Sequence, residues 1–307
     1  MKFFFIRDLD GEEQRKPRKD RIPVSLMCEV LGVSRSGFYA WLKRDRPDRE
    51  EEDTELTEVI KNIHEDHKGR LGISRLVAEL AKIGRRHSPR RVRRLARAAG
   101  LTCVHPRPYR ATTIQDKASG HGLVDLVGRE FVPDGPNQLW YTDITYIPTW
   151  GGWAYLTSII DGYSRKIVGW SVDSHMRTNL VTDALRMAIE RQRPGIGEVV
   201  IHSDRGCQYT STDFRALALA NGIIPSVGRT GICYDNAMAE AFNATIKKEL
   251  IHLHTWPTLR TVRNAIFEYI EVYYNRKRPH SSIGNATPSE MEHNSLRTID
   301  SKMAATA

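Results

Sequence analysis

Hydrophobic residues recur at helical spacing in roughly the first hundred residues and at strand spacing from about residue 136 onwards. Residues 23–43 predict two short helices around a turn glycine, Gly32, with Ser34 as the N-cap of the second helix. The apolar faces of the two helices are predicted at Leu26, Val30 and Leu31 and at Phe38, Trp41 and Leu42. This order is typical of a helix-turn-helix, whose second helix would offer Ser34 and Arg35 to a DNA groove.

A second helical unit is predicted at residues 54–100, and the acidic run at 48–55 separates it from the first. Its first two helices have these apolar positions: Leu56, Val59, Ile60 and Ile63, then Leu76, Val77 and Leu80. A third helix begins at Ser88–Pro89 and stops before Gly100, because serine caps, proline opens and glycine ends a helix well. Five arginines flank its narrow apolar stripe and favour phosphate contact over a solvated face: Arg90, Arg91, Arg93, Arg94 and Arg97.

The strand-rich part begins with three β-rich runs, LWYTDITYIP, WAYLTSIIDGYS and RKIVGWSVDSH, which predict an antiparallel meander. Helices are expected at 180–190 and 213–221, strands at 198–204 and 223–227, and a long helix near 235–251 with Asp235 as its N-cap. Strands in series followed by strand–helix alternation predict a mixed five-stranded sheet flanked by helices.

Five segments follow from these patterns. We delimit a polar, flexible lead-in with the helix-turn-helix at 1–47, the second helical unit at 54–100 and a Pro/Gly-rich linker at 101–135. The α/β domain occupies 136–255, and a helical extension and tail occupy 256–307.

Charge distinguishes the two halves of the chain. Residues 1–120 hold 27 Lys and Arg against 18 Asp and Glu, whereas the remaining residues hold 19 of each, so the whole net charge of +9 lies in the helical half. This excess fits a part that follows a phosphate backbone, although a solvated basic surface is the simpler alternative.

Composition limits the other possibilities. The chain has no apolar run long enough for a membrane span and no signal peptide at its start, so we expect a location in the cytosol. Four dispersed cysteines predict neither a disulfide framework nor a zinc site, and we expect them to be buried or half-buried thiols.

Three acidic residues stand in unusual positions. Asp143 lies inside a hydrophobic strand, Asp204 ends the apolar strand VVIHSD, and Glu240 lies 35 residues further on in the long helix. Carboxylates brought together from two strand ends and a crossing helix would repel one another without a cation. They would supply the oxygen ligands that a pair of Mg²⁺ ions requires, so we predict a metal site.

The words YTDITYI, HSDRGCQYTS, NAMAEAFNATIKKEL and YNRKRPHSSIGNATPSE resemble the insertion-sequence DDE transposases of the IS-three family, in particular their second reading-frame product. The likeness extends over most of residues 23–291. It implies an RNase H-like fold, that of the retroviral integrase catalytic core, with Asp143, Asp204 and Glu240 as catalytic metal ligands. It also implies that Lys247 contacts DNA from the same face of the helix as Glu240.

The resemblance further implies cleavage and joining of DNA ends with Mg²⁺ or Mn²⁺, two ions per site, and no covalent protein intermediate. DNA is the expected partner, at the terminal inverted repeats and at the target. Joining two ends implies a homo-oligomer, and fusion to an upstream first-frame product by frameshifting is expected in this family. Two alternatives stay open: a DNA-binding regulator that has lost catalysis, and a ribonuclease or junction resolvase.

Several neighbouring residues have alternative roles. His202 and Asn236 flank the acids and could contact DNA or orient a ligand, and Asp161 is predicted as a turn or strand-end residue rather than a fourth metal ligand. We expect Tyr273 to His280 to combine packing with DNA contact. The tryptophans at 140, 150, 153 and 170 are expected in the core rather than as base-stacking platforms.

Overall fold

The computed structural model describes residues 2–17, 21–42, 48–104, 133–228, 236–295 and 297, so most of the predicted linker lies outside the described residues. The chain divides into two compact units, residues 1–62 and 63–307. The predicted N-cap Asp235 and the end of the C-terminal tail are also outside the described part.

The first unit contains the helices α1 (Lys2–Glu13), α2 (Val24–Val30) and α3 (Arg35–Leu42), and it includes most of α4 (Asp48–Asp66). The prediction of a flexible lead-in was wrong, because Lys2–Glu13 is helical and buries Ile6. Ile6 packs in one cluster with Met27, Cys28 and Phe38, which is a tertiary contact that the weak apolar pattern of this segment does not reveal.

The helix-turn-helix order of α2 and α3 is as predicted. Gly32 has a φ of +61°, and the Ser34 hydroxyl accepts a hydrogen bond from the Gly37 amide at 2.9 Å. The predicted apolar face of α2 was wrong, however, since Leu26 and Val30 are exposed. Met27 and Cys28 face the core instead, with Val24 and Leu31 packed beside them, because residues 24, 27, 28 and 31 share one helical face.

Helix α4 begins at Asp48, so the acidic run forms the start of this helix rather than a separator. Leu56 and Ile60 are its buried residues. The helices α5 (Ile73–Lys82) and α6 (Pro89–Ala98) follow. The Ser88 hydroxyl caps α6 by accepting from the Arg91 amide at 3.3 Å, and Gly100 takes the left-handed conformation just past its end.

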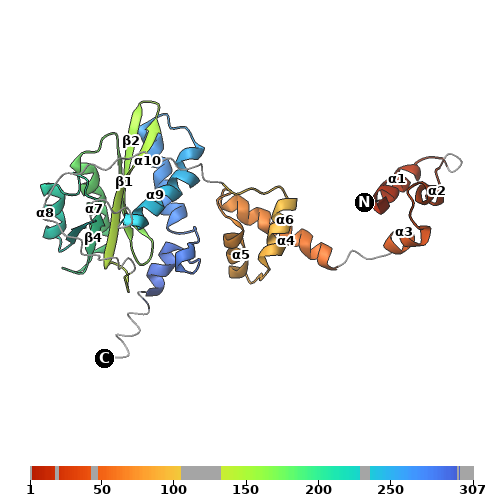
Figure 1. The fold of residues 1–307 in the computed structure, drawn as a ribbon, viewed down its shortest axis with the longest axis horizontal. Coiled ribbons are helices and arrows are strands. Elements are labelled where there is room, and N and C mark those ends of the chain that lie inside the picture. The colour runs from red at the N-terminus through yellow and green to blue at the C-terminus, as the bar shows by residue number, and fades with distance from the viewer. Residues whose placement is uncertain are drawn as a thin grey trace, which may run out of the picture. The chain divides into compact units, whose positions relative to one another are not determined.

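The sheet of the second unit consists of β1 (Leu139–Thr149), β2 (Gly152–Asp161), β3 (Ile167–Asp173), β4 (Val200–Ser203) and β5 (Ile224–Val227). The strand order is β3-β2-β1-β4-β5. Figure 1 shows the sheet with its flanking helices. The first three strands form the predicted antiparallel meander, while β1, β4 and β5 run parallel. This is the mixed five-stranded sheet that the sequence predicts.

Helices cover both faces of this sheet, because strands β1 and β4 are apolar on both sides. One core contains Trp140, Leu185 and Phe214 and lies under α7 (Thr178–Gln192) and α8 (Thr212–Ala220). The other contains Tyr141 and Phe242 and lies under α9 (Ala237–Glu249) and α10 (Leu259–Phe267).

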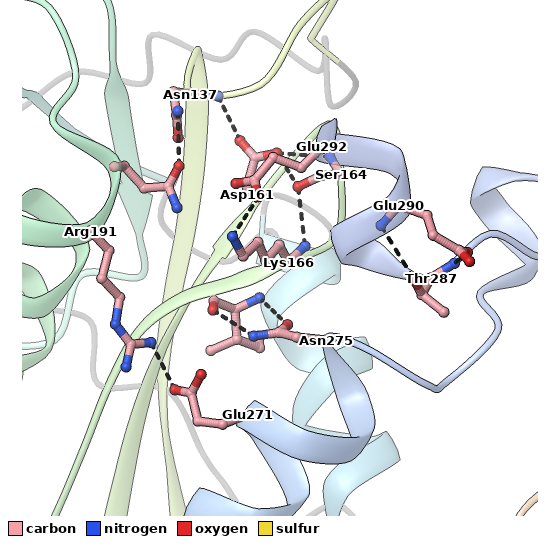
Figure 2. A network of polar contacts seen from close by, with 12 residues as sticks. Asn137, Asp161, Ser164, Lys166, Arg191, Glu271, Asn275, Thr287, Glu290 and Glu292 are labelled. Atoms are coloured by element: carbon pink, nitrogen blue, oxygen red, sulfur yellow. Dashed lines mark hydrogen bonds and ion pairs between the residues drawn. The ribbon is translucent and has the colours of Figure 1, made fainter. Parts of the chain in front are cut away.

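The C-terminal segment belongs to this second core and is not a separate extension beginning at 256. The buried cluster around Tyr141 includes Ile266 of α10 and Tyr274 of the π-helix Glu268–Tyr274 that continues α10. Polar contacts fix the same segment to the turn between β2 and β3 (Figure 2). The Asn275 side chain accepts from the Ile167 amide at 2.9 Å and donates to the Ile167 carbonyl at 3.0 Å, and Lys166 forms an ion pair with Glu292.

Candidate active site

Asp143 lies on β1, and Asp204 directly follows the neighbouring parallel strand β4 at a matching position. Strand β1 pairs with β4 through Tyr141 and His202, and each aspartate follows its paired residue by two positions. Residues two apart on a strand point to the same face, so both carboxylates are directed to one side at the end of β4. The Asp143 carboxylate accepts from the Ile144 amide at 2.8 Å, and that of Asp204 accepts from the Gly206 amide at 3.0 Å.

Helix α9 contributes the third acid and is held to β1 by two amide side chains. Asn243 donates to the Asp143 carboxylate at 2.9 Å, and Asn236, at the N-cap position of α9, donates to the Thr142 carbonyl at 3.0 Å. Glu240 lies three residues before Asn243 and therefore on the same side of the helix. The two asparagines thus fix the first turns of α9 beside Asp143.

Each of the three acids has a raised pKa. Burial and then the charge of Asp204 raise the pKa of Asp143 to about 7, with a smaller effect of Glu240. The pKa of Asp204 is raised by burial, and that of Glu240 by burial and by the charge of Asp204. The acids are therefore close enough to repel one another, and no cationic side chain is among the causes of these shifts.

The residues at this site fit a divalent cation of the Mg²⁺ or Mn²⁺ type. Within the described residues no three His, Cys, Asp or Glu side chains stand together as a ready-made metal site. The donor set is nevertheless made of carboxylates, which such cations prefer, and the mutual repulsion is what a cation would relieve. Close by, the buried Oδ1 atom of Asn243 has no hydrogen-bond partner in the described part of the chain.

Other predicted site residues have structural surroundings. His202 is buried, and its Nδ1 atom lies 3.0 Å from the Ser226 hydroxyl, which argues against DNA contact. Asn236 is also buried and bonded to β1, which favours the predicted positioning role over the predicted DNA contact. Asp161 was correctly predicted as a turn or strand-end residue: it is the last residue of β2, and its carboxylate accepts from the backbone amides of Asn137 and Ser164 (Figure 2).

The predicted DNA-contacting residues occupy three separate places. Ser34 and Arg35 are exposed at the start of α3, although the Ser34 hydroxyl is already engaged in capping. In α6 four arginines are exposed and Arg91 is half-buried; the exposed ones are Arg90, Arg93, Arg94 and Arg97. Lys247 is half-buried on α9, two turns beyond Glu240.

Two predictions about burial were wrong. Trp140 and Trp170 are in the core as expected, but Trp150 and Trp153 are exposed because the end of the β1–β2 hairpin extends past the helices that cover the sheet. Cys207 is also exposed. Sequence reasoning missed Asn243, although its spacing of three residues from Glu240 was a usable signal.

In the region from Tyr273 to His280 the predicted packing is present, since Tyr273, Tyr274 and Arg278 are buried. Arg276 and Lys277 are the exposed positions of this segment.

Comparison with known families agrees with this arrangement. Residues 133–233 and 221–288 each match a family described as "Integrase core domain", and residues 50–109 match an "HTH-like domain". The chain thus has an integrase-type catalytic core, and its HTH-like domain coincides with the second predicted helical unit rather than with α2 and α3.

Curated relatives match over nearly the whole chain. An insertion element IS600 protein of 31 kDa from Shigella sonnei is 40% identical over 86% of this chain and 96% of its own length. The transposase InsF for insertion sequence IS3A from Escherichia coli strain K12 is 35% identical over 96% of this chain and 100% of its own length. The chain therefore belongs to the IS3 family of DDE transposases, which are polynucleotidyl transferases.

Among solved structures, the chain resembles the HTLV-2 integrase catalytic core domain in complex with magnesium. The TM-score is 0.41 at 18% identity, and the match covers 52% of this chain and 99% of that one. No helix in the described part of the chain is long and apolar enough to cross a membrane.

Proposed function

We propose that this chain cleaves the ends of its insertion sequence and joins them to target DNA, with Asp143, Asp204 and Glu240 as the catalytic metal ligands. The reaction is phosphoryl transfer in two steps. Water attacks a phosphodiester at the element end and a 3′-hydroxyl leaves; that hydroxyl then attacks a phosphodiester of the target DNA, whose own 3′-oxygen leaves. No side chain is needed as a nucleophile, because both attacking groups are oxygens of water or DNA.

The observation that carries this proposal is the matched position of Asp143 and Asp204 on paired strands, with α9 bonded to the first of them through Asn243. A structural carboxylate is normally compensated by cations or by several hydrogen bonds. Here burial and like charges raise the pKa of Asp143 to about 7. An acid held in such surroundings supports a role in binding a cation.

Asp143, Asp204 and Glu240 would hold Mg²⁺ or Mn²⁺, with two ions per site as the specific form of the proposal. When bound, such ions activate the attacking oxygen and stabilise the leaving oxygen in an in-line displacement. Asn243 orients the Asp143 carboxylate by donating to one of its oxygens, and Asn236 fixes the start of α9 to β1. These contacts place the three acids before any cation or DNA arrives.

DNA capture is assigned to the basic helical half. We propose that the α6 arginines contact phosphates, that Ser34 and Arg35 meet a groove, and that Lys247 holds DNA beside Glu240. Because two ends are joined, we propose that at least a dimer assembles on DNA. The reaction is placed in the bacterial cytosol. Fusion to an upstream first-frame product stays a prediction that sequencing the flanking DNA would test.

The test uses a labelled duplex that carries the terminal inverted repeat, taken from the DNA around the gene. Asp143→Asn, Asp204→Asn and Glu240→Gln are expected to reduce cleavage and joining under Mg²⁺ by on the order of a thousand-fold, with DNA affinity largely kept. Asp183→Asn is the matched control, because Asp183 is an exposed acid of α7 paired with Arg186. It should remain active.

Full activity of a purified variant would remove that residue from the site. Wild-type protein that binds the repeat but joins nothing would favour the regulator alternative, and nicking without regard to sequence would favour the nuclease.

A further inference from the structure

An exposed aromatic surface lies on the β1–β2 hairpin. Tyr146 is 47% exposed, Trp153 55% and Trp150, in the turn, 76%. Tyr146 contacts both Trp153 and Tyr155 edge to face, with ring centroids 6.2 and 5.3 Å apart. Clustered aromatic side chains in water are unusual enough to indicate a binding surface.

The strand register explains why these rings share one face. Tyr146 is paired with Tyr155, and Pro148 is paired with Trp153, so the four side chains emerge on the same side of the hairpin. The opposite side is covered, because Ile147 and Ala154 belong to the core cluster that also contains Trp256. We call Tyr146, Trp153 and Tyr155, with Trp150 at the turn, the aromatic platform.

The platform is held rigidly at its outer end. The Thr149 hydroxyl donates to the Gly152 carbonyl at 3.0 Å across the turn. The Trp150 amide donates to the Trp256 carbonyl at 3.0 Å, which ties the turn to the segment between α9 and α10. A surface fixed in this way loses little conformational entropy when it binds a partner.

The platform lies near the acids along β1 but on the other face of the sheet. Tyr146 follows Asp143 by three residues, which is about 10 Å along a strand, and this odd separation directs the two side chains to opposite faces. The pairing of β1 with β4 ends at Tyr141 and His202, so the same edge of β1 carries Asp143 and then Tyr146 without a neighbouring strand in the described part of the chain. After burial and Tyr155, the charges of Asp143 and Asp204 are further causes that raise the pKa of Tyr146.

We propose that the aromatic platform stacks against a nucleobase of the DNA a few nucleotides from the reacting phosphate, with Trp153 and Tyr146 as the principal contacts. This inference rests on the proposed function, because it takes the phosphate to react at Asp143 and Asp204. Nucleotides in a duplex are spaced by about 3.4 Å, so 10 Å corresponds to roughly three nucleotides. The base leaves the duplex stack and gains a stacking partner in the protein.

DNA fits this surface better than a second protein chain does. The acids close to the platform repel one another, and under the proposed function they hold cations that bind a DNA phosphate. DNA is therefore the partner that this end of β1 would already meet. Every base offers a flat π-face, so stacking suits an enzyme that must also accept varied target sequences.

The experiment measures binding of full-length protein to duplexes that carry the terminal repeat, each with an abasic site at one position around the cleaved bond. Wild-type affinity should change several-fold at one or two positions only. In Trp153→Ala and Tyr146→Ala the affinity for intact duplex should fall by on the order of ten-fold. In the same variants, the abasic site that changes wild-type affinity should have no further effect, because the missing base and the missing ring belong to one contact.

Trp153→Phe should keep the discrimination, and Phe267→Ala, which removes a ring 53% exposed on α10, should leave binding unchanged. The proposal is overturned if abasic effects are the same in wild type and Trp153→Ala. It is also overturned if Trp153→Ala changes only the sedimentation of DNA-free protein, which would identify an interface between copies. Binding does not require catalysis, so loss of cleavage by wild type would count against the proposed function alone.

Discussion

The two ends of α9 place carboxylates in opposite surroundings. Near its first turn, Glu240 and Asp143 lie beside Asp204, and no cationic side chain is among the causes of their pKa shifts. Burial together with the charge of Asp204 raises the pKa of Asp143 to about 7. At its last residue, the buried Glu249 carboxylate accepts three hydrogen bonds from Arg278, the shortest at 2.8 Å. It accepts a fourth from the Tyr269 hydroxyl at 2.9 Å.

The comparison separates a stabilising site from the site proposed for catalysis. At Glu249 burial raises the pKa, but the hydrogen bonds and charge of Arg278 outweigh it, so the pKa is lowered. At Asp143 the bonds from Ile144 and Asn243 do not outweigh burial and the neighbouring acids. The fold therefore stabilises the charged form of Glu249 at one end of α9 and destabilises the charged form of Asp143 at the other end. Such a loss of stability is expected at a site selected for activity.

The largest effect is expected from breaking the stabilising end. Arg278→Met should lower the free energy of unfolding by about 3–5 kcal/mol, because it leaves the Glu249 carboxylate buried without its main partner. Denaturant unfolding measures this loss. Arg276→Met, in the turn two residues before Arg278 and exposed, should change stability by no more than about 0.5 kcal/mol. Equal effects of both variants would show that the ion pair does not hold this end.

A smaller effect with the opposite sign is expected at Asp143. Its pKa is raised from 3.8 to about 7, so the folded state binds the proton more tightly, and this contribution to stability is lost as the pH rises from about 4 to about 7. Without metal, Asp143→Asn should therefore be more stable than wild type at pH 8 by on the order of 1 kcal/mol, with little gain at pH 4. Thermal melts across this pH range give the difference, and a pH-independent difference would contradict the assignment.

The last expected effect, similar in size to that of Asp143→Asn, is the stabilisation by the cation itself. At ten times its Kd, Mg²⁺ should stabilise wild-type protein by about 1.4 kcal/mol, which is a rise in Tm of a few degrees. Asp143→Asn and Asp204→Asn should show little of this rise, and Asp183→Asn should show all of it. Ca²⁺ without DNA is a useful second cation because it takes the same oxygen ligands. A rise of equal size in all variants would place the cation elsewhere.

Features set by local sequence were predicted well. Ser88, Pro89 and Gly100 bound α6 as expected, since capping and left-handed glycine act within a few residues. The meander and the positions of Asp143 and Asp204 followed from strand runs and turns. Their positions at strand ends suggested that they meet, and the family resemblance implied the fold that brings them together, because strand order depends on contacts between distant segments.

Features set by tertiary contact were missed. The exposure of Trp150 and Trp153 depends on how far the helices extend over the sheet, and the hydrophobic pattern of the sequence does not indicate that extent. Helix α1 is stabilised by Ile6 packing on α2 and α3, and the Glu249–Arg278 pair joins residues 29 positions apart. The C-terminal segment was separated from the core for the same reason, although Ile266 and Tyr274 complete it.

The anchored end of α9 also receives Arg70, which precedes α5 in the HTH-like domain and donates to the Glu249 carbonyl at 3.1 Å. Glu240 and Glu249 are nine residues apart, so about 13 Å of rigid helix separates them. If α9 moves as a rigid helix, a tilt at its C-terminal end near Glu249 also moves its N-terminal end near Glu240. The loop that carries Arg70 thus contacts the helix that carries Glu240, and we expect a substitution of Arg70 to shift Glu240 relative to Asp143 without removing a DNA contact.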